Sequence, residues 1–228
     1  MDDKEFFNGL ARTRGAYKVY PDREYSRIFA ASGITAEAKG LSVLDAGCGS
    51  GAFSGFLAGM GFAVTGLDIS DEMIALAKAN ITNVRFLAGD IFRAPLPESS
   101  FDIVFCGGVL HHVPGRLREC ALEFRRVLKP GGRVYFFEPY AFSLNSLLWY
   151  KLLSLDRTSG EAALAPEKVA AEFTAAGFGK MSWSRVDGIE HLHGGEASLT
   201  GRSVAALRGF VSRHLIPNTY FTGHMDKL

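Results

Sequence analysis

Val43-Leu44-Asp45-Ala46-Gly47-Cys48-Gly49-Ser50-Gly51 is the stretch that decides the fold. A short apolar run ends in an acid, and three glycines at alternate positions then lead into the apolar run 52–60. The first run predicts a buried strand, and the second predicts a helix whose free N–H groups face the turn. Glycine permits positive φ and leaves room for a ligand beside the backbone. Together these features predict the first strand, turn and helix of a doubly wound α/β sheet, where such sheets bind nucleotide-like ligands.

The glycine spacing alone fits two kinds of nucleotide site. Gly47, Gly49 and Ala52 satisfy the dinucleotide pattern, and Asp68 follows about 20 residues later, where a ribose-binding acid belongs. Asp45 and Gly51 favour a different ligand, because a carboxylate beside the turn suits an ammonium group and disfavours a pyrophosphate. A plain tight turn explains one or two glycines, but not three with flanking acids.

The motif resembles that of the class I S-adenosylmethionine-dependent methyltransferases, in which an acid precedes three alternating glycines. The resemblance covers roughly residues 40–140. Val109-Leu110-His111-His112-Val113 is similar to the small-molecule branch that includes quinone-biosynthesis enzymes, and 128–132 (Leu-Lys-Pro-Gly-Gly) to a late family motif. The resemblance implies a Rossmann-like, doubly wound sheet of seven strands with an antiparallel last strand. It also implies N-terminal helices and a helical lid after strand five.

Composition narrows the class of protein further. The 228 residues are 47% apolar with a net charge of +1, so one folded domain is expected and no long-range field attracts nucleic acid. No apolar run reaches the ~20 residues of a membrane span, and the acidic start is unlike a signal peptide. Three cysteines without a CxxC pair favour reduced thiols, so we expect a cytoplasmic protein without a nucleic-acid partner.

The predicted organisation is one methyltransferase domain over residues 1–228. Within it we expect an N-terminal helical cover at 1–36, a cofactor-binding core at 37–139, and substrate or lid elements at 140–178 and 188–214. Hydrophobic periodicity and helix stop signals place the remaining elements. The predicted helices are 3–11, 22–33, 70–80, 116–128, 166–177 and 203–214, and the later strands are 62–67, 84–88, 101–105, 133–137, 181–186 and 220–225.

Acids follow three successive predicted strands, at Asp45, Asp68 and Asp90. The resemblance implies that Asp45 and the glycine turn hold the amino-acid end of S-adenosylmethionine, that Asp68 binds the ribose, and that Asp90 with Ile91 binds the adenine. By physics alone, Asp90 could instead cap a turn, and Met73 could belong to the core. The predicted cofactor-binding residues are Asp45, Gly47, Cys48, Gly49, Gly51, Asp68, Ile69, Met73, Asp90, Ile91 and Gly107.

The methyl acceptor is specified by weaker features. His112, or the adjacent His111, could remove a proton from an acceptor hydroxyl, or could fix the lid by hydrogen bonding. Residues 140–155 carry apolar side chains on more than one helical face, which suits a lid over an apolar pocket or a contact between two copies of the chain. The candidate substrate residues are Tyr17, Tyr140, Trp149 and Tyr150.

These patterns predict methyl transfer from S-adenosylmethionine to a small, apolar or aromatic molecule by in-line displacement, leaving S-adenosylhomocysteine. An NAD(P)-dependent oxidoreductase and a non-catalytic S-adenosylmethionine-binding protein are the alternatives. A nucleic-acid methyltransferase is disfavoured, because Cys106-Gly107-Gly108-Val109 replaces the Asn/Asp-Pro-Pro-Tyr/Phe motif. His191, His193 and Glu196 could in principle hold a metal, but glycines 194 and 195 favour a surface loop, and no metal site is predicted.

Overall fold

The computed structural model describes residues 2–14, 22–34, 39–143, 160–187 and 219–228. In this part of the chain seven strands form one sheet in the order β3-β2-β1-β4-β5-β7-β6. The first five strands run parallel, and β7 is antiparallel to both β5 and β6, as predicted. The strands are β1 (Ser42–Ala46), β2 (Ala63–Asp68), β3 (Arg85–Ala88), β4 (Phe101–Gly107), β5 (Leu128–Pro139), β6 (Ser182–Asp187) and β7 (Thr219–Asp226).

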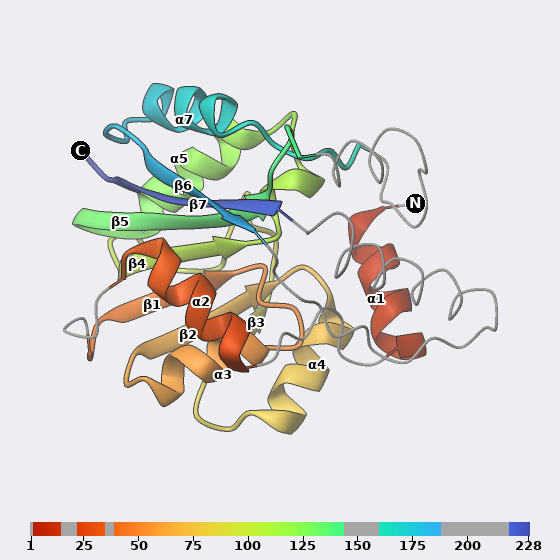
Figure 1. Ribbon diagram of the computed structural model, residues 1–228. Coiled ribbons are helices and arrows are strands. Elements are labelled where there is room, and N and C mark those ends of the chain that lie inside the picture. The colour runs from red at the N-terminus through yellow and green to blue at the C-terminus, as the bar shows by residue number, and fades with distance from the viewer. Residues whose placement is uncertain (1, 15–21, 35–38, 144–159, 188–218) are drawn as a thin grey trace.

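Helices cover both faces of the sheet (Figure 1). One face lies under α5 and α7, and the opposite face lies under α2 and α3, while α1 stands beyond the carboxyl ends of the strands and packs on α4. None of the helices described is long and apolar enough to cross a bilayer. The helices are α1 (Asp3–Arg14), α2 (Asp22–Ser32), α3 (Ala52–Gly59), α4 (Asp71–Asn80), the 3-10 turn η2 (Leu110–His112), α5 (Leu117–Val127) and α7 (Pro166–Ala175).

The two-sided core explains why the central strands are apolar along their whole length. Side chains alternate between the faces of a strand. Leu44 and Val104 therefore pack in the cluster beneath α5 and α7, while their neighbours Val43 and Ile103 pack in the cluster beneath α2 and α3. A sheet covered on both faces leaves little room for polar side chains in its middle strands. Polar groups are instead found at the strand ends.

Most predicted boundaries agree with the structure, and two local findings add detail. The Ser70 side chain caps α4 by accepting a hydrogen bond from the Met73 N–H at 3.1 Å, as predicted. Strand β5 begins at Leu128, five residues before its predicted start at 133. Leu128 pairs with Phe101, and the register then shifts so that Arg133 pairs with Ile103. Pro130 and the following glycines therefore end α5 while the chain already lies beside β4.

Several predictions concern residues outside the described ranges. These are most of the lid at 140–155, the helix at 203–214, and the side chains of Tyr17, Trp149, Tyr150, His191, His193 and Glu196.

Candidate functional site

A pocket opens at the carboxyl ends of β1, β2 and β4, and α1 contributes to its lining. Its lining includes every predicted cofactor-binding residue except Gly51, together with His111 and His112. Because the parallel strands end at one edge, residues far apart in the chain meet around a single cavity. The structure thus brings together groups that the sequence only placed at separate strand ends.

The glycine turn is tightly packed. Its first two residues donate their N–H groups to the Leu67 carbonyl, Gly47 at 2.7 Å and Cys48 at 3.0 Å. Gly47 has φ +78°, and a Cβ there would lie 2.1 Å from Cγ2 of Val109. Gly51 has φ +84°, and a Cβ there would lie 2.6 Å from Cζ of Phe86. Gly47 therefore faces both the pocket and the segment after β4, whereas Gly51 is required for packing against β3.

Asp68 is fixed by the backbone around it. Its Oδ2 accepts the Gly49 N–H at 2.8 Å, and its Oδ1 accepts the Ser70 N–H at 2.9 Å. Burial raises the pKa of this carboxyl, and these N–H groups partly oppose the rise. Each carboxylate oxygen has two acceptor sites, so Asp68 retains capacity for the hydroxyl groups of a ligand.

Asp45 is the more deeply buried acid, with 4% of its surface exposed. Its Oδ2 accepts the Ser54 hydroxyl at 2.5 Å. Burial raises the pKa of Asp45 to about 7, and the nearby charge of Asp68 adds to the rise. The described residues that line the pocket include no lysine or arginine. A ligand cation would therefore stabilise the ionised form of Asp45 at this point.

The Cys48 side chain is close enough to both acids to be affected by their charges. Burial, followed by the charges of Asp45 and Asp68, raises the pKa of the Cys48 thiol well above its usual range. A thiol is nucleophilic as the thiolate, so Cys48 is suited to contact a ligand rather than to attack one.

Asp90 caps a turn and Met73 belongs to the core, and both residues also line the pocket. Asp90 Oδ1 accepts the Phe92 N–H at 2.9 Å, which is the turn-capping bond considered from the sequence. Its side chain is nevertheless exposed and borders the cavity. Met73 is 2% exposed and is both a core and a lining residue. For these residues packing and ligand contact are compatible.

His111 is anchored by a glutamate that sequence reasoning missed. The His111 ring is fully buried, and its Nδ1 lies 2.7 Å from Oε2 of Glu138. Oε1 of Glu138 accepts the N–H groups of Val109 at 2.9 Å and Leu110 at 2.8 Å. Glu138 ends the apolar strand β5, and a buried acid at the end of such a strand was the available sequence signal. His112 is more accessible, and the edge of its ring contacts Phe7, with the ring centroids 5.2 Å apart.

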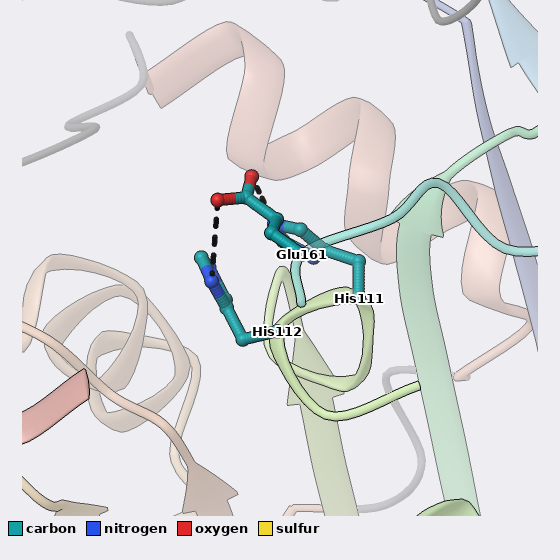
Figure 2. Close-up of side chains that lie close together, drawn as sticks. All are labelled: His111, His112 and Glu161. Carbon is teal, nitrogen blue, oxygen red and sulfur yellow. Dashed lines mark ion pairs between the residues drawn. The ribbon is translucent and has the colours of Figure 1, made fainter. Parts of the chain in front are cut away.

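A second missed glutamate, Glu161, lies between the two histidines (Figure 2). Its Oε1 is 3.6 Å from His111 Nε2, and its Oε2 is 3.6 Å from His112 Nδ1. The backbone fixes this segment, because Ala162 N–H donates to the His111 carbonyl at 2.8 Å and Leu164 forms a bridge with Tyr140. No sequence signal pairs Glu161 with residues about 50 positions earlier, since only the fold brings them together.

Helix α1 borders the pocket through Asp3 and Phe7. It is attached to α4 by Asn8, whose Oδ1 accepts the Ser70 hydroxyl at 2.7 Å. Tyr140, predicted to contact substrate, is absent from the described lining. Its ring instead lies 5.6 Å from that of Phe142 and 6.1 Å from that of Trp183.

Comparison with known proteins identifies the central part of the chain. Residues 44–136 match the family model described as a methyltransferase domain. The chain is 38% identical over 122 residues to a malonyl-[acyl-carrier protein] O-methyltransferase of Pectobacterium atrosepticum, covering 53% of this chain and 48% of that one. It is 40% identical over 107 residues to a demethylmenaquinone methyltransferase of Lactococcus lactis, covering 43% and 42%. The chain thus spans about half the length of these curated relatives.

A solved structure agrees with the fold along nearly the whole chain. A SAM-dependent methyltransferase from Archaeoglobus fulgidus aligns with a TM-score of 0.64 at 19% identity, covering 97% of this chain and 99% of that one. Residues 44–136 therefore match a methyltransferase domain, and the fold is that of the class I S-adenosylmethionine-dependent methyltransferases. The predicted resemblance to the small-molecule branch is confirmed, since curated relatives are named for quinone biosynthesis.

Proposed function

We propose that the protein transfers the methyl group of S-adenosylmethionine to a small, apolar or aromatic acceptor by in-line displacement. The observation that carries the proposal is the placement of Asp45, Asp68 and the glycine turn around one cavity that has no described lysine or arginine in its lining. Two buried carboxylates beside an open turn fit a cationic amino-acid nucleoside and repel a pyrophosphate. This charge pattern favours S-adenosylmethionine over a nicotinamide dinucleotide.

In this proposal the family roles apply residue by residue. Asp45 faces the ammonium group and Asp68 the ribose hydroxyls, while Asp90 and Ile91 contact the adenine beside Ile69 and Met73. The glycine turn with Cys48 and Gly107 accommodates the methionine portion. Bound S-adenosylmethionine supplies an electrophilic methyl group, so the protein's task is to align an acceptor and exclude water.

The remaining lining supports an apolar or aromatic acceptor. Aromatic side chains from α1, α2, α3, β4, β5 and β7 contribute to it: Phe7, Tyr25, Phe53, Phe105, Phe137 and Tyr220. Such rings favour apolar ligands. His112 borders the cavity and is the preferred group to remove a proton from an acceptor hydroxyl, with His111 held behind it by Glu138. The proposed acceptor contacts also include Tyr17, Tyr140, Trp149 and Tyr150. A homodimer contact through 140–155 and a cytoplasmic location are proposed as well.

Isothermal titration calorimetry tests the cofactor assignment. We expect the protein to bind S-adenosylhomocysteine and not NAD(H), and Asp68→Ala to weaken that binding about 10- to 100-fold, because hydrogen bonds to a charged group contribute about 1.5–3 kcal/mol. The matched control is Asp226→Ala, since Asp226 pairs with Arg133 at the opposite end of the sheet. Tight NAD(H) binding without S-adenosylhomocysteine binding would overturn the proposal. Turnover against a panel of phenols and quinols then separates an enzyme from a cofactor-binding protein.

A further inference from the structure

The cluster of His111, His112 and Glu161 has the geometry of a metal site. Each side chain offers one ligand atom, and these three atoms lie within 4.8 Å of one another. Two of the nitrogen–oxygen separations are 3.6 Å. Ligands at about 2.1 Å from one tetrahedral ion are about 3.4 Å apart, so an ion between these groups needs only small side-chain shifts.

The hydrogen bond from His111 to Glu138 decides which ring nitrogen faces Glu161 as an acceptor. Glu138 is held as an acceptor by two backbone N–H groups on Oε1, and its Oε2 therefore takes the Nδ1–H of His111. In the neutral ring this leaves a lone pair on Nε2, directed toward a carboxylate oxygen of Glu161. Two acceptors at 3.6 Å repel each other, whereas a cation between them attracts both.

This arrangement also reproduces the support that metal-bound histidines need. A ligating imidazole usually donates its other N–H to a carboxylate, which fixes the tautomer and increases the basicity of the ligating nitrogen. Glu138 supplies that carboxylate for His111. On the other side, the Ala162 N–H bond to the His111 carbonyl holds the Glu161 segment against the same turn. The ligand set is thus fixed from two directions by the fold.

We propose that His111, His112 and Glu161 bind one divalent transition-metal ion, of which Zn²⁺ matches the ligands best. Two imidazoles and one carboxylate suit zinc, and three protein ligands leave a fourth position open. Both histidines border the pocket, so an ion bound here would lie beside the cavity. If the proposed function holds, the open position receives the acceptor hydroxyl and lowers its pKa, which eases loss of its proton. Metal binding itself does not depend on that function.

The test begins with chelator-treated full-length protein titrated with ZnCl₂ by calorimetry. We expect one Zn²⁺ per chain, and Co²⁺ bound in its place to show the visible absorption of a tetrahedral ion. Glu161→Gln and His112→Ala should weaken Zn²⁺ binding by at least the ~10- to 100-fold typical of altering a supporting residue. Glu161→Asp retains the carboxylate and should bind with intermediate affinity. The matched control is Glu119→Gln, because Glu119 is exposed and pairs only locally with Arg116.

Circular dichroism establishes that each variant is folded, and S-adenosylhomocysteine affinity is measured on the same samples. The site would be overturned if the wild type does not bind Zn²⁺, or if Glu161→Gln and His112→Ala both bind Zn²⁺ as tightly as the wild type. Either result would indicate a protonated His111 between two carboxylates. Loss of S-adenosylhomocysteine binding from the wild type with Zn²⁺ binding intact would instead contradict the proposed function alone.

Discussion

The two halves of the pocket are built in different ways. The half proposed to hold the cofactor consists of β1, β2 and β3 with the turns that follow them. Its acids Asp45 and Asp68 are held by N–H groups of these turns and by the Ser54 hydroxyl of α3. The acceptor half consists of η2, the end of β5 and the segment around Glu161, and its acids are held by histidines and backbone groups from distant parts of the chain. Local sequence specifies the first half, whereas the tertiary fold specifies the second.

The two halves therefore differ in how many separate chain segments each depends on. In the cofactor half, Asp45 and Asp68 are each held by groups no more than 19 positions away in the chain. The acceptor half depends on three segments arriving at one place, so a change in any of them alters the site. The halves meet where Gly47 faces Val109.

The largest effect is expected at that meeting point. Gly47→Ala should destabilise the protein by about 2–5 kcal/mol, the sum of left-handed strain and overpacking against Val109. Gly40→Ala is the matched control, since Gly40 has φ +84° with nothing within 4 Å of a Cβ, and it should cost only about 1–2 kcal/mol. Urea unfolding measures both. Equal losses would show that the two halves are mechanically independent here.

Asp45→Asn should separate binding from stability. We expect S-adenosylhomocysteine affinity to fall about 10- to 100-fold, because a charge-assisted bond of about 1.5–3 kcal/mol is lost. Because the pKa of Asp45 is about 7 in the folded protein against its ordinary value of 3.8, its buried carboxyl lowers the stability of the folded state progressively as pH rises from 3.8 to 7. Above pH 7 the variant should therefore melt a few degrees higher than the wild type, at about 2–4 °C per kcal/mol. A lower melting temperature at pH 8 would contradict this account of Asp45.

The same acid should give cofactor binding a pH dependence. With the pKa of Asp45 at about 7 in the free protein, affinity for S-adenosylhomocysteine should rise about tenfold from pH 6 to pH 8, as binding expels the proton. Calorimetry in buffers of different ionisation enthalpy measures that proton release. Asp45→Asn should remove both the slope and the release. An unchanged slope in the variant would assign the titration to another group.

The smallest effect is expected at the cover over the cofactor half. Asn8→Ala removes the acceptor of the Ser70 hydroxyl and should make S-adenosylhomocysteine dissociate a few-fold faster, since one hydrogen bond contributes about 0.5–1.5 kcal/mol. Within the described ranges Arg12, on the same helix, forms an exposed ion pair with Glu72, and Arg12→Ala should change little. Stopped-flow displacement compares the two rates. Equal rates in both variants would mean that α1 does not control exit from the pocket.

Sequence predicted the fold and the cofactor half because both depend on local patterns. Alternation of apolar runs and helix stops located the strands, and Asp45, Asp68 and Asp90 each lie at or near the carboxyl end of one. The packing role of Gly51 was less visible, because Phe86, which fills the space where its Cβ would lie, belongs to β3 and is distant in the chain. Glu138 and Glu161 were missed because a lone acid has no periodic pattern. Their partners, His111 and His112, were found only because they lie within a motif next to β4.

The Tyr140–Leu164 bridge joins the two ends of the segment that follows β5. The chain leaves the sheet after Pro139 and returns beside the same point, where Leu164 N–H donates to the Pro139 carbonyl at 3.1 Å. An inserted segment whose two ends lie side by side can be replaced by another without shifting any strand. If the segment between Tyr140 and Glu161 contacts the acceptor, as proposed, exchanging this segment between methyltransferase domains should transfer substrate preference, provided that the replacement keeps a glutamate three residues before the position of Leu164.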